Sequence, residues 1–144
     1  MLAAVMLGIP ALAEAVSPAP ITGTWITQDQ RGIVRIGTCG NVACGTIIGT
    51  GPALAHISTT PLDTNNTNPR LRGRPLVGIA LIPEARREGD HWSGQIYAPR
   101  EGRLFPATFN TTRDGKLRIK GCFWFICHTE IWQPVSQSGG VASH

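Results

Sequence analysis

The chain has 144 residues, 42% of them hydrophobic and 15% charged, which is typical of one folded domain and leaves no room for two. The 13 Lys and Arg outnumber the 9 Asp and Glu and give a formal net charge of +4. These basic residues are scattered, whereas a nucleic-acid-binding surface needs them clustered, so we expect no nucleic-acid partner.

Residues 1–13 are typical of a signal peptide. The apolar run from Leu2 to Leu12 is too short to cross a bilayer, and it ends in Ala11-Leu12-Ala13, a small-x-small pattern that export peptidases cut. No Lys or Arg precedes this run, and a buried N-terminal helix is the alternative. Cleavage after Ala13 predicts a periplasmic or secreted protein.

Eight segments rich in β-branched and aromatic residues follow, and most are separated by tight turns. The strongest hairpin signal is Asp114-Gly115, and residues 116–122 alternate basic with apolar side chains, as half-buried strands do. The expected strands are 21–27, 31–39, 43–50, 75–82, 92–98, 103–110, 116–122 and 128–135. This pattern predicts an all-β domain over residues 21–135, a single up-and-down antiparallel barrel of about eight strands. The polar tail, 136–144, is expected to be disordered.

The four cysteines form two equally spaced pairs, Cys39 with Cys44 and Cys122 with Cys127. An even number of cysteines in an exported protein indicates disulfides, and although three connectivities are possible, a hairpin loop between each pair favours local bonds. A four-cysteine zinc site is the alternative, but zinc ribbons usually use two-residue spacings. We therefore expect two disulfides and no metal.

Over about residues 21–135 the chain is similar to a bacterial family of small exported proteins, domain-of-unknown-function family 2147. The matching motifs are Gly23-Thr24-Trp25, Cys39-Gly40, Cys44-Gly45, the loop from Asp63 to Gly78, the run from Trp92 to Pro99, and the run from Leu117 to Cys122. The resemblance implies a lipocalin-like barrel in the cell envelope and no particular chemistry. In lipocalin-like barrels the first-strand Trp closes the floor and often stacks on a late Arg, which implies this structural role for Trp25 and Arg118.

The polar segment 51–74 is unusually long for a loop in a small domain, which indicates a functional or mobile element. Its best candidates are the acceptors Asp63 and Asn66 and the forked donors Arg72 and Arg74. A calcium loop fails, because Arg74 stands where a bidentate Glu is required. Either these side chains order the loop itself, or the paired arginines recognise a carboxylate or phosphate at the barrel mouth.

Trp92 and Tyr97 fall on opposite faces of their expected strand, so only one of them can point into the barrel. If Tyr97 does, the interior is partly polar and must hold water or a ligand. If Trp92 does, the interior is a packed core. The sequence leaves both alternatives open.

Cys122 and Cys127 enclose four apolar residues, among them Phe123, Trp124 and Phe125. On an exposed hairpin this segment would form a contact surface for a membrane or an envelope protein. Folded inward, it would cap one end of the barrel.

No catalytic motif is present, because the four His are dispersed and neither a nucleophile elbow nor a phosphate loop occurs. We therefore expect a protein that is not an enzyme and needs no cofactor. The first hypothesis is a barrel that binds a small, partly apolar ligand, and the alternative is an envelope interaction module with a packed barrel that acts through its surface and aromatic hairpin. The ligand-binding candidates are Asn66, Arg72, Arg74, Trp92 and Tyr97.

Overall fold

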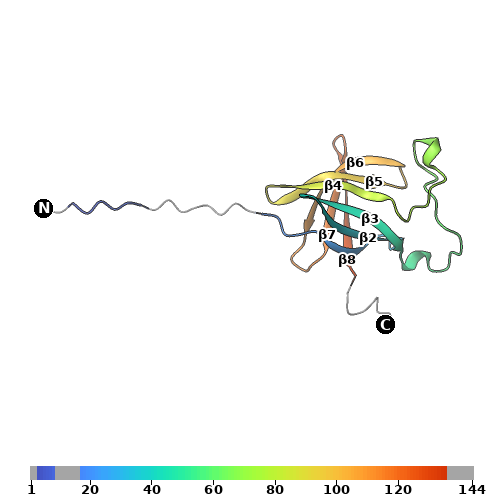
Figure 1. Cartoon of the computed structure of the whole chain (residues 1–144), viewed down its shortest axis with the longest axis horizontal. Coiled ribbons are helices and arrows are strands. Elements are labelled where there is room, and N and C mark those ends of the chain that lie inside the picture. The colour runs from blue at the N-terminus through green and yellow to red at the C-terminus, as the bar shows by residue number, and fades with distance from the viewer. Residues whose placement is uncertain (1–2, 9–16, 136–144) are drawn as a thin grey trace.

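The computed structural model describes residues 3–8 and 17–135, and these form an eight-stranded closed barrel preceded by an extended segment (Figure 1). The strands are β1 (Gly23–Ile26), β2 (Gly32–Cys39), β3 (Val42–Thr50), β4 (Ala80–Glu88), β5 (His91–Ala98), β6 (Arg103–Thr111), β7 (Leu117–Phe123) and β8 (Ile126–Pro134). Each strand pairs antiparallel with the next, and β1 pairs with β8 through Trp25 and Pro134. The predicted all-β, up-and-down barrel is therefore confirmed.

The fourth strand was predicted in the wrong place, at 75–82, because its apolar residues read as a strand. In the structure Gly78 has φ +102°, and the Ile79 N–H bonds the Leu76 carbonyl, so this apolar run makes a turn. Leu76 and Ile79 pack against the core from this turn, and Leu81 and Ile82 pack from the start of β4. The true strand, β4, continues through charged residues that the sequence places outside any apolar pattern, because their side chains face solvent.

One end of the barrel, which we call the floor, is closed by large side chains. The inward-facing residues there include Trp25, Trp92, Phe109 and Trp132, all buried. The segment before β1 crosses beneath them, so that the Trp25 indole N–H donates to the Ile21 carbonyl at 3.0 Å and the Trp92 indole N–H to the Ala19 carbonyl at 2.9 Å. These bonds satisfy the polar edge of each indole inside an apolar core.

Above the floor, a belt of small inward-facing residues crosses five neighbouring strands. The register joins them in one row: Ala43, Ala85, Gly94, Ala107 and Gly121. The three alanines are 0%, 0% and 5% exposed, so other side chains contact them on the inner face. The barrel is therefore packed at these three alanines, while Gly94 and Gly121 in the same row are partly exposed. Strand alternation places Trp92 inward and Tyr97 on the outer face.

The opposite end, which we call the mouth, carries the β1–β2, β3–β4, β5–β6 and β7–β8 connections. The longest of these, between β3 and β4, contains two short 3₁₀ turns, η1 (Pro52–Leu54) and η2 (Pro69–Leu71). In Figure 1 this connection projects from the barrel on the side away from the N-terminal segment. All candidate loop residues thus belong to the mouth.

Both cysteine pairs lie at disulfide distance, as predicted. Cys39 and Cys44, across the β2–β3 hairpin at the floor, have Cα atoms 6.0 Å apart, and Cys122 and Cys127, across the β7–β8 hairpin at the mouth, have Cα atoms 4.1 Å apart. Each bond therefore joins two neighbouring strands close to their turn. The two pairs lie at opposite ends of the barrel, so the four cysteines do not come together as one four-cysteine site.

The N-terminal residues 3–8 are exposed and form no helix, so the alternative of a buried N-terminal helix is wrong for this stretch. The expected cleavage site after Ala13 and the tail 136–144 lie outside the described residues. Among helices of the described part, none is long and apolar enough to span a membrane.

Candidate functional site

The β3–β4 loop folds back over the outer face of β5 near the mouth. Its two ends are joined by a bridge between Leu62 and Pro75 and by the Asp63 N–H, which donates to the Arg74 carbonyl at 2.9 Å. Its middle is held to the β5–β6 turn, where the Thr67 N–H donates to the Gly102 carbonyl at 3.0 Å. Gly102 has φ +70°, and a Cβ there would overlap the loop backbone, so this position requires glycine.

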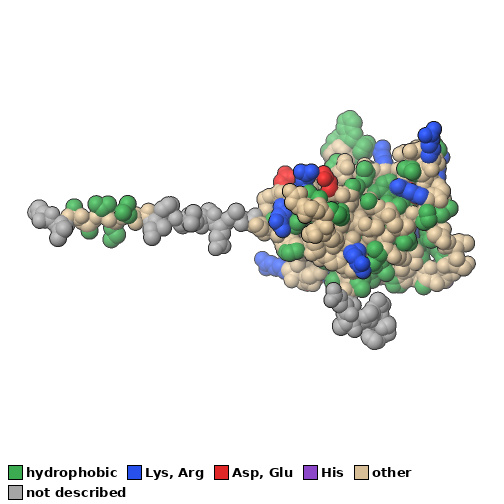
Figure 2. All heavy atoms as spheres, viewed as in Figure 1, with side chains coloured by type: hydrophobic (Ala, Val, Ile, Leu, Met, Phe, Trp, Pro, Cys, Tyr) green, Lys and Arg blue, Asp and Glu red, His purple; other side chains and the backbone are tan. Residues whose placement is uncertain are grey.

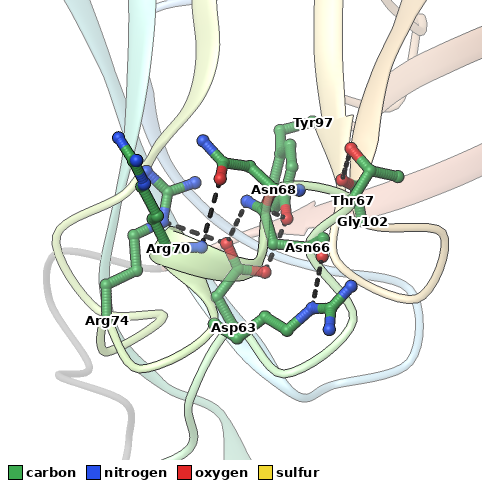
Figure 3. Close-up of polar contacts among 9 residues, drawn as sticks. Asp63, Asn66, Thr67, Asn68, Arg70, Arg74, Tyr97 and Gly102 are labelled. Atoms are coloured by element: carbon green, nitrogen blue, oxygen red, sulfur yellow. Dashed lines mark hydrogen bonds and ion pairs between the residues drawn. The ribbon is translucent and has the colours of Figure 1, made fainter.

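A buried carboxylate lies at the centre of this loop, as Figure 3 shows. Asp63, 1% exposed, accepts a hydrogen bond from the Tyr97 hydroxyl at 2.5 Å on Oδ1. On Oδ2 it accepts from Asn66 Nδ2 at 2.8 Å and from Arg74 Nε at 2.9 Å. The Arg74 guanidinium also lies over the Tyr97 ring, 5.6 Å from its centroid. The loop and β5 are therefore joined by one charged, hydrogen-bonded cluster, which we call the Asp63 cluster.

The electrostatics of the Asp63 cluster keep the carboxylate ionised and the phenol neutral. Burial alone would raise the pKa of Asp63, but hydrogen bonds from Tyr97, Asn66 and Arg74 together hold it below the ordinary value of 3.8. Burial and the neighbouring Asp63 carboxylate raise the pKa of Tyr97 to about 12. Near neutral pH these shifts leave the proton on the Tyr97 hydroxyl and the negative charge on the Asp63 carboxylate.

The remaining contacts of the cluster are also internal. The Asn66 side-chain oxygen accepts from the Asn68 N–H at 2.8 Å, and the Asn66 carbonyl accepts from Arg72 Nε at 2.8 Å. No buried side-chain polar atom of the described residues lacks a hydrogen-bond partner. Asn66, Arg72, Arg74 and Tyr97 are thus brought together, as the sequence suggested, and their contacts order the loop.

Trp92, the fifth ligand-binding candidate, lies at the floor, away from the other four. Its ring contacts the Arg87 guanidinium, which lies 5.2 Å from the ring centroid. The expected stacking of Arg118 on Trp25 is wrong: Arg118 is exposed on the outer face of β7, because it alternates with the inward-facing Leu117 and Ile119. Arg87, in β4, was not indicated by any pattern in the sequence.

The hairpin between β7 and β8 exposes four successive apolar side chains at the mouth: Phe123, Trp124, Phe125 and Ile126. We call this segment the aromatic tip. Trp124 is 81% and Phe125 88% exposed, so of the two arrangements considered, an inward cap and an exposed surface, the structure has the second. The Phe123 ring packs edge-to-face on Phe105 with centroids 6.0 Å apart, which joins the tip to the mouth of the barrel.

Two cavities formed by described residues lie on the outside of the barrel wall. One, of about 290 Å³, lies beside the β3–β4 loop and is lined by Thr50, Leu54, Ile57, Pro61 and Val77 among others. The other, of about 380 Å³, lies at the β1–β8 seam between Ile26, Gln28, Ile131 and Gln133. Neither is lined by the inward-facing residues. Within the described part of the chain, no group of three or more His, Cys, Asp or Glu is placed to hold a metal ion.

The structure is similar to that of protein HP1028 from Helicobacter pylori, which is described as belonging to the lipocalin family. The TM-score is 0.70 at 19% sequence identity, over 83% of this chain and 86% of that one. At this identity the likeness shows the fold alone, a lipocalin-like barrel. No curated protein matches the chain. A family model matches residues 23–134, the whole barrel, and the chain belongs to that family, described as an uncharacterized protein conserved in bacteria (DUF2147).

Proposed function

We propose that this protein is an exported, non-catalytic interaction module of the cell envelope that works through its aromatic tip. The single observation that carries this proposal is the contrast between a barrel packed at its belt and four apolar side chains exposed together at its mouth. A contiguous apolar surface on a folded domain marks a site of contact with another surface.

The packed belt argues against a ligand in the barrel lumen. At the belt Ala43, Ala85 and Ala107 are buried and Gly94 and Gly121 are partly exposed, whereas a ligand-holding lumen would leave most inward-facing positions exposed to its contents. Ligand pockets are usually clefts of about 300–1,000 Å³ that enclose most of the ligand. The barrel therefore serves as a rigid support for its loops.

The proposal that the protein is not an enzyme rests on the state of its buried titratable groups. A general base must be able to accept a proton from substrate. The carboxylate of Asp63 already accepts three hydrogen bonds from Tyr97, Asn66 and Arg74, and its pKa is lowered. This favours a structural role for the Asp63 cluster.

Export is proposed from the signal-like residues 1–13 together with the two local disulfides. Disulfides persist in oxidising compartments such as the periplasm and are rare in the reducing cytosol.

Site-specific crosslinking in the native host tests the module directly. With p-benzoylphenylalanine in place of Phe125, we expect ultraviolet light to attach an envelope component, either a protein or a lipid. The matched control carries the same group in place of Arg113, which is exposed on the β6–β7 turn at the floor. Equal crosslinking from both positions, or none from either, would contradict the proposal.

A second candidate function is the binding of a small ligand, and the observation in its favour is the cavity of about 290 Å³ beside the β3–β4 loop. Apolar side chains line it together with the hydroxyls of Thr50, Ser58, Thr59 and Thr60. Native mass spectrometry of protein purified from its own host tests this. A reproducible added mass that is lost in Val77→Trp, which fills the cavity, would support it, and bare protein in every preparation would oppose it.

A further inference from the structure

We infer that the partner of the aromatic tip is a membrane surface that contains anionic lipid. In this arrangement Trp124 and Phe125 enter the interfacial layer, and arginines at the mouth contact lipid phosphates. This inference rests on the proposed function and names the surface on which the tip docks.

The backbone of the tip is the first argument. Trp124 occupies the left-handed region with φ +59°, at the first position of a two-residue turn where glycine is normally favoured. A bulky residue held there is strained, and such strain is a pointer to function when the side chain has no structural task. Trp124 is 81% exposed, and its contact in the structure is an edge-to-face approach to Phe123. Its side chain is therefore presented to something outside the protein.

The chemistry of the tip suits the boundary between water and lipid. Indole rings concentrate at membrane interfaces, because they are amphipathic and place an N–H among the polar headgroups. The tip also includes Phe125 and Ile126, which would lie beside Trp124 in the apolar part of that layer. The Cys122–Cys127 pair joins the strands at its base, so little order is lost when the tip binds.

Positive charge lies at the base of the tip and elsewhere on the mouth. The Arg103 guanidinium lies 4.7 Å from the Phe123 centroid and 5.2 Å from that of Phe105, which places a cation at the base of the aromatic tip. The other arginines at the mouth are Arg70, Arg72 and Arg74 in the loop and Arg100 in the β5–β6 turn. Figure 2 shows blue loop side chains and a green protrusion projecting from the same upper side of the barrel.

The loop arginines are oriented by the Asp63 cluster. In contacts between described residues, Arg72 and Arg74 use Nε to bind the Asn66 carbonyl and the Asp63 carboxylate, respectively. The terminal nitrogens of both guanidinium groups are left for another acceptor, and forked N–H donors suit phosphate oxygens. Arg100 lies 3.9 Å from Asp29, a separation too long to hold it firmly.

The shape of the tip favours a lipid surface over a protein partner. A stable protein interface buries about 800 Å² on each partner through about 20–30 residues. The tip is a protruding hairpin of four apolar residues, which is too small for such an interface. A convex apolar tip with Arg103 at its base and further arginines at the same end of the barrel instead matches an apolar layer covered by phosphates.

Vesicle binding of the oxidised protein without residues 1–13, the form expected after export, tests this inference. The probes are vesicles of phosphatidylcholine alone and of phosphatidylcholine mixed with phosphatidylglycerol. We expect binding to the anionic vesicles, weakened by added salt because exposed charges are screened. Since Trp25, Trp92 and Trp132 are buried, a blue shift of the tryptophan emission on binding would report on Trp124.

Variants separate the apolar and charged contributions. Phe125→Ser should lower the partition coefficient about tenfold, because one large apolar side chain no longer leaves water. Its matched control, Ile48→Ser, removes an exposed apolar side chain from β3 and should leave binding unchanged. Arg103→Gln should lower binding to anionic vesicles about fivefold, whereas Arg113→Gln, at the floor, should not.

Trp124→Gly separates an effect on binding from an effect on folding. It should abolish the blue shift and weaken binding while the thermal unfolding midpoint stays the same or rises, because glycine accepts the left-handed backbone. A lower midpoint would show that the tip is a structural cap and overturn the inference. No binding of the wild type to either vesicle would also overturn it, while protein crosslinks from position 125 would leave the proposed function intact. Equal binding to both kinds of vesicle would show that anionic lipid is not required and would overturn that part of the inference.

Discussion

The two ends of this barrel use aromatic residues in opposite ways. At the floor, three tryptophans are buried, and the indole N–H groups of Trp25 and Trp92 donate to carbonyls of the crossing N-terminal segment. At the mouth, Trp124 and Phe125 are mostly exposed in a turn with a strained backbone. The difference teaches that position within the barrel, rather than residue type, separates the aromatics that stabilise the fold from those available for contact.

The largest expected effect is at the floor. Trp132→Ala should lower the free energy of unfolding by about 3–5 kcal/mol, because it empties a buried space at the closed end. Trp124→Ala is the matched control, and we expect it to change the stability by less than about 1 kcal/mol. Chemical denaturation measures the free energy of unfolding of both variants. Equal losses would contradict the expected difference between the buried floor and the exposed tip.

The Asp63 cluster comes next, because it is the buried polar part of the mouth. Asp63→Asn should destabilise the protein by about 2–3 kcal/mol, since the remaining side chain cannot accept all three hydrogen bonds and leaves Arg74 without its ion pair. Hydrogen exchange of loop amides would show whether the loss is local to 61–76. Unchanged protection there would argue that the loop is held by its apolar contacts alone.

Removal of the disulfide at the mouth should have a smaller effect. Cys122→Ser combined with Cys127→Ser should cost about 2 kcal/mol, because the bond closes only a short loop and restricts the unfolded chain little. Vesicle binding should weaken further than this stability change explains, since the tip becomes less ordered before it binds. If the double serine variant binds vesicles as strongly as the wild type does, the order of the tip does not contribute to binding.

The pH dependence of the free energy of unfolding should reflect the ionisation of both Asp63 and Tyr97. The pKa of Asp63 is lowered in the folded state, so its stabilisation is complete above the ordinary value of 3.8 and is lost as pH falls through the lower, folded value. The pKa of Tyr97 is raised to about 12, so its stabilisation is present below the ordinary value of 10.0 and is lost as pH rises from there toward 12.

Tyr97→Phe should cost about 1 kcal/mol at neutral pH, the value of one hydrogen bond, and should remove the alkaline loss of stability. Thermal unfolding from pH 9 to pH 12 measures this. An alkaline transition that persists in Tyr97→Phe would have to come from other groups.

The smallest effect on stability is expected at the tip. Trp124→Gly should leave the free energy of unfolding unchanged or raise it by up to about 1 kcal/mol, because a strained left-handed position is relieved. Chemical denaturation beside Trp132→Ala would place the two ends of the barrel on one scale.

Much of the fold could be predicted from local patterns. The Asp114-Gly115 turn, the alternation in 116–122 and the two cysteine pairs each describe neighbouring residues, and the structure has them as expected. The strand predicted at 75–82 was wrong over 75–79, because apolar residues that cover the core from a turn have the composition of a buried strand. Residues 83–88 were not predicted as strand, because only Ala85 among them is buried and no apolar alternation marks them.

Only part of the candidate site could be predicted from the sequence. The sequence indicated Asn66, Arg72 and Arg74 because they lie close together in one polar loop, but the bond between Asp63 and Tyr97 joins residues 34 positions apart. The inward direction of Trp92, the outward direction of Arg118 and the exposure of the tip also depended on how distant strands meet. The sequence by itself indicated most of the strands, the hairpins and the pairing of neighbouring cysteines, because these follow from neighbours along the chain. Only the tertiary structure decided which faces are buried and which polar groups pair, because closing the barrel brings distant residues into contact.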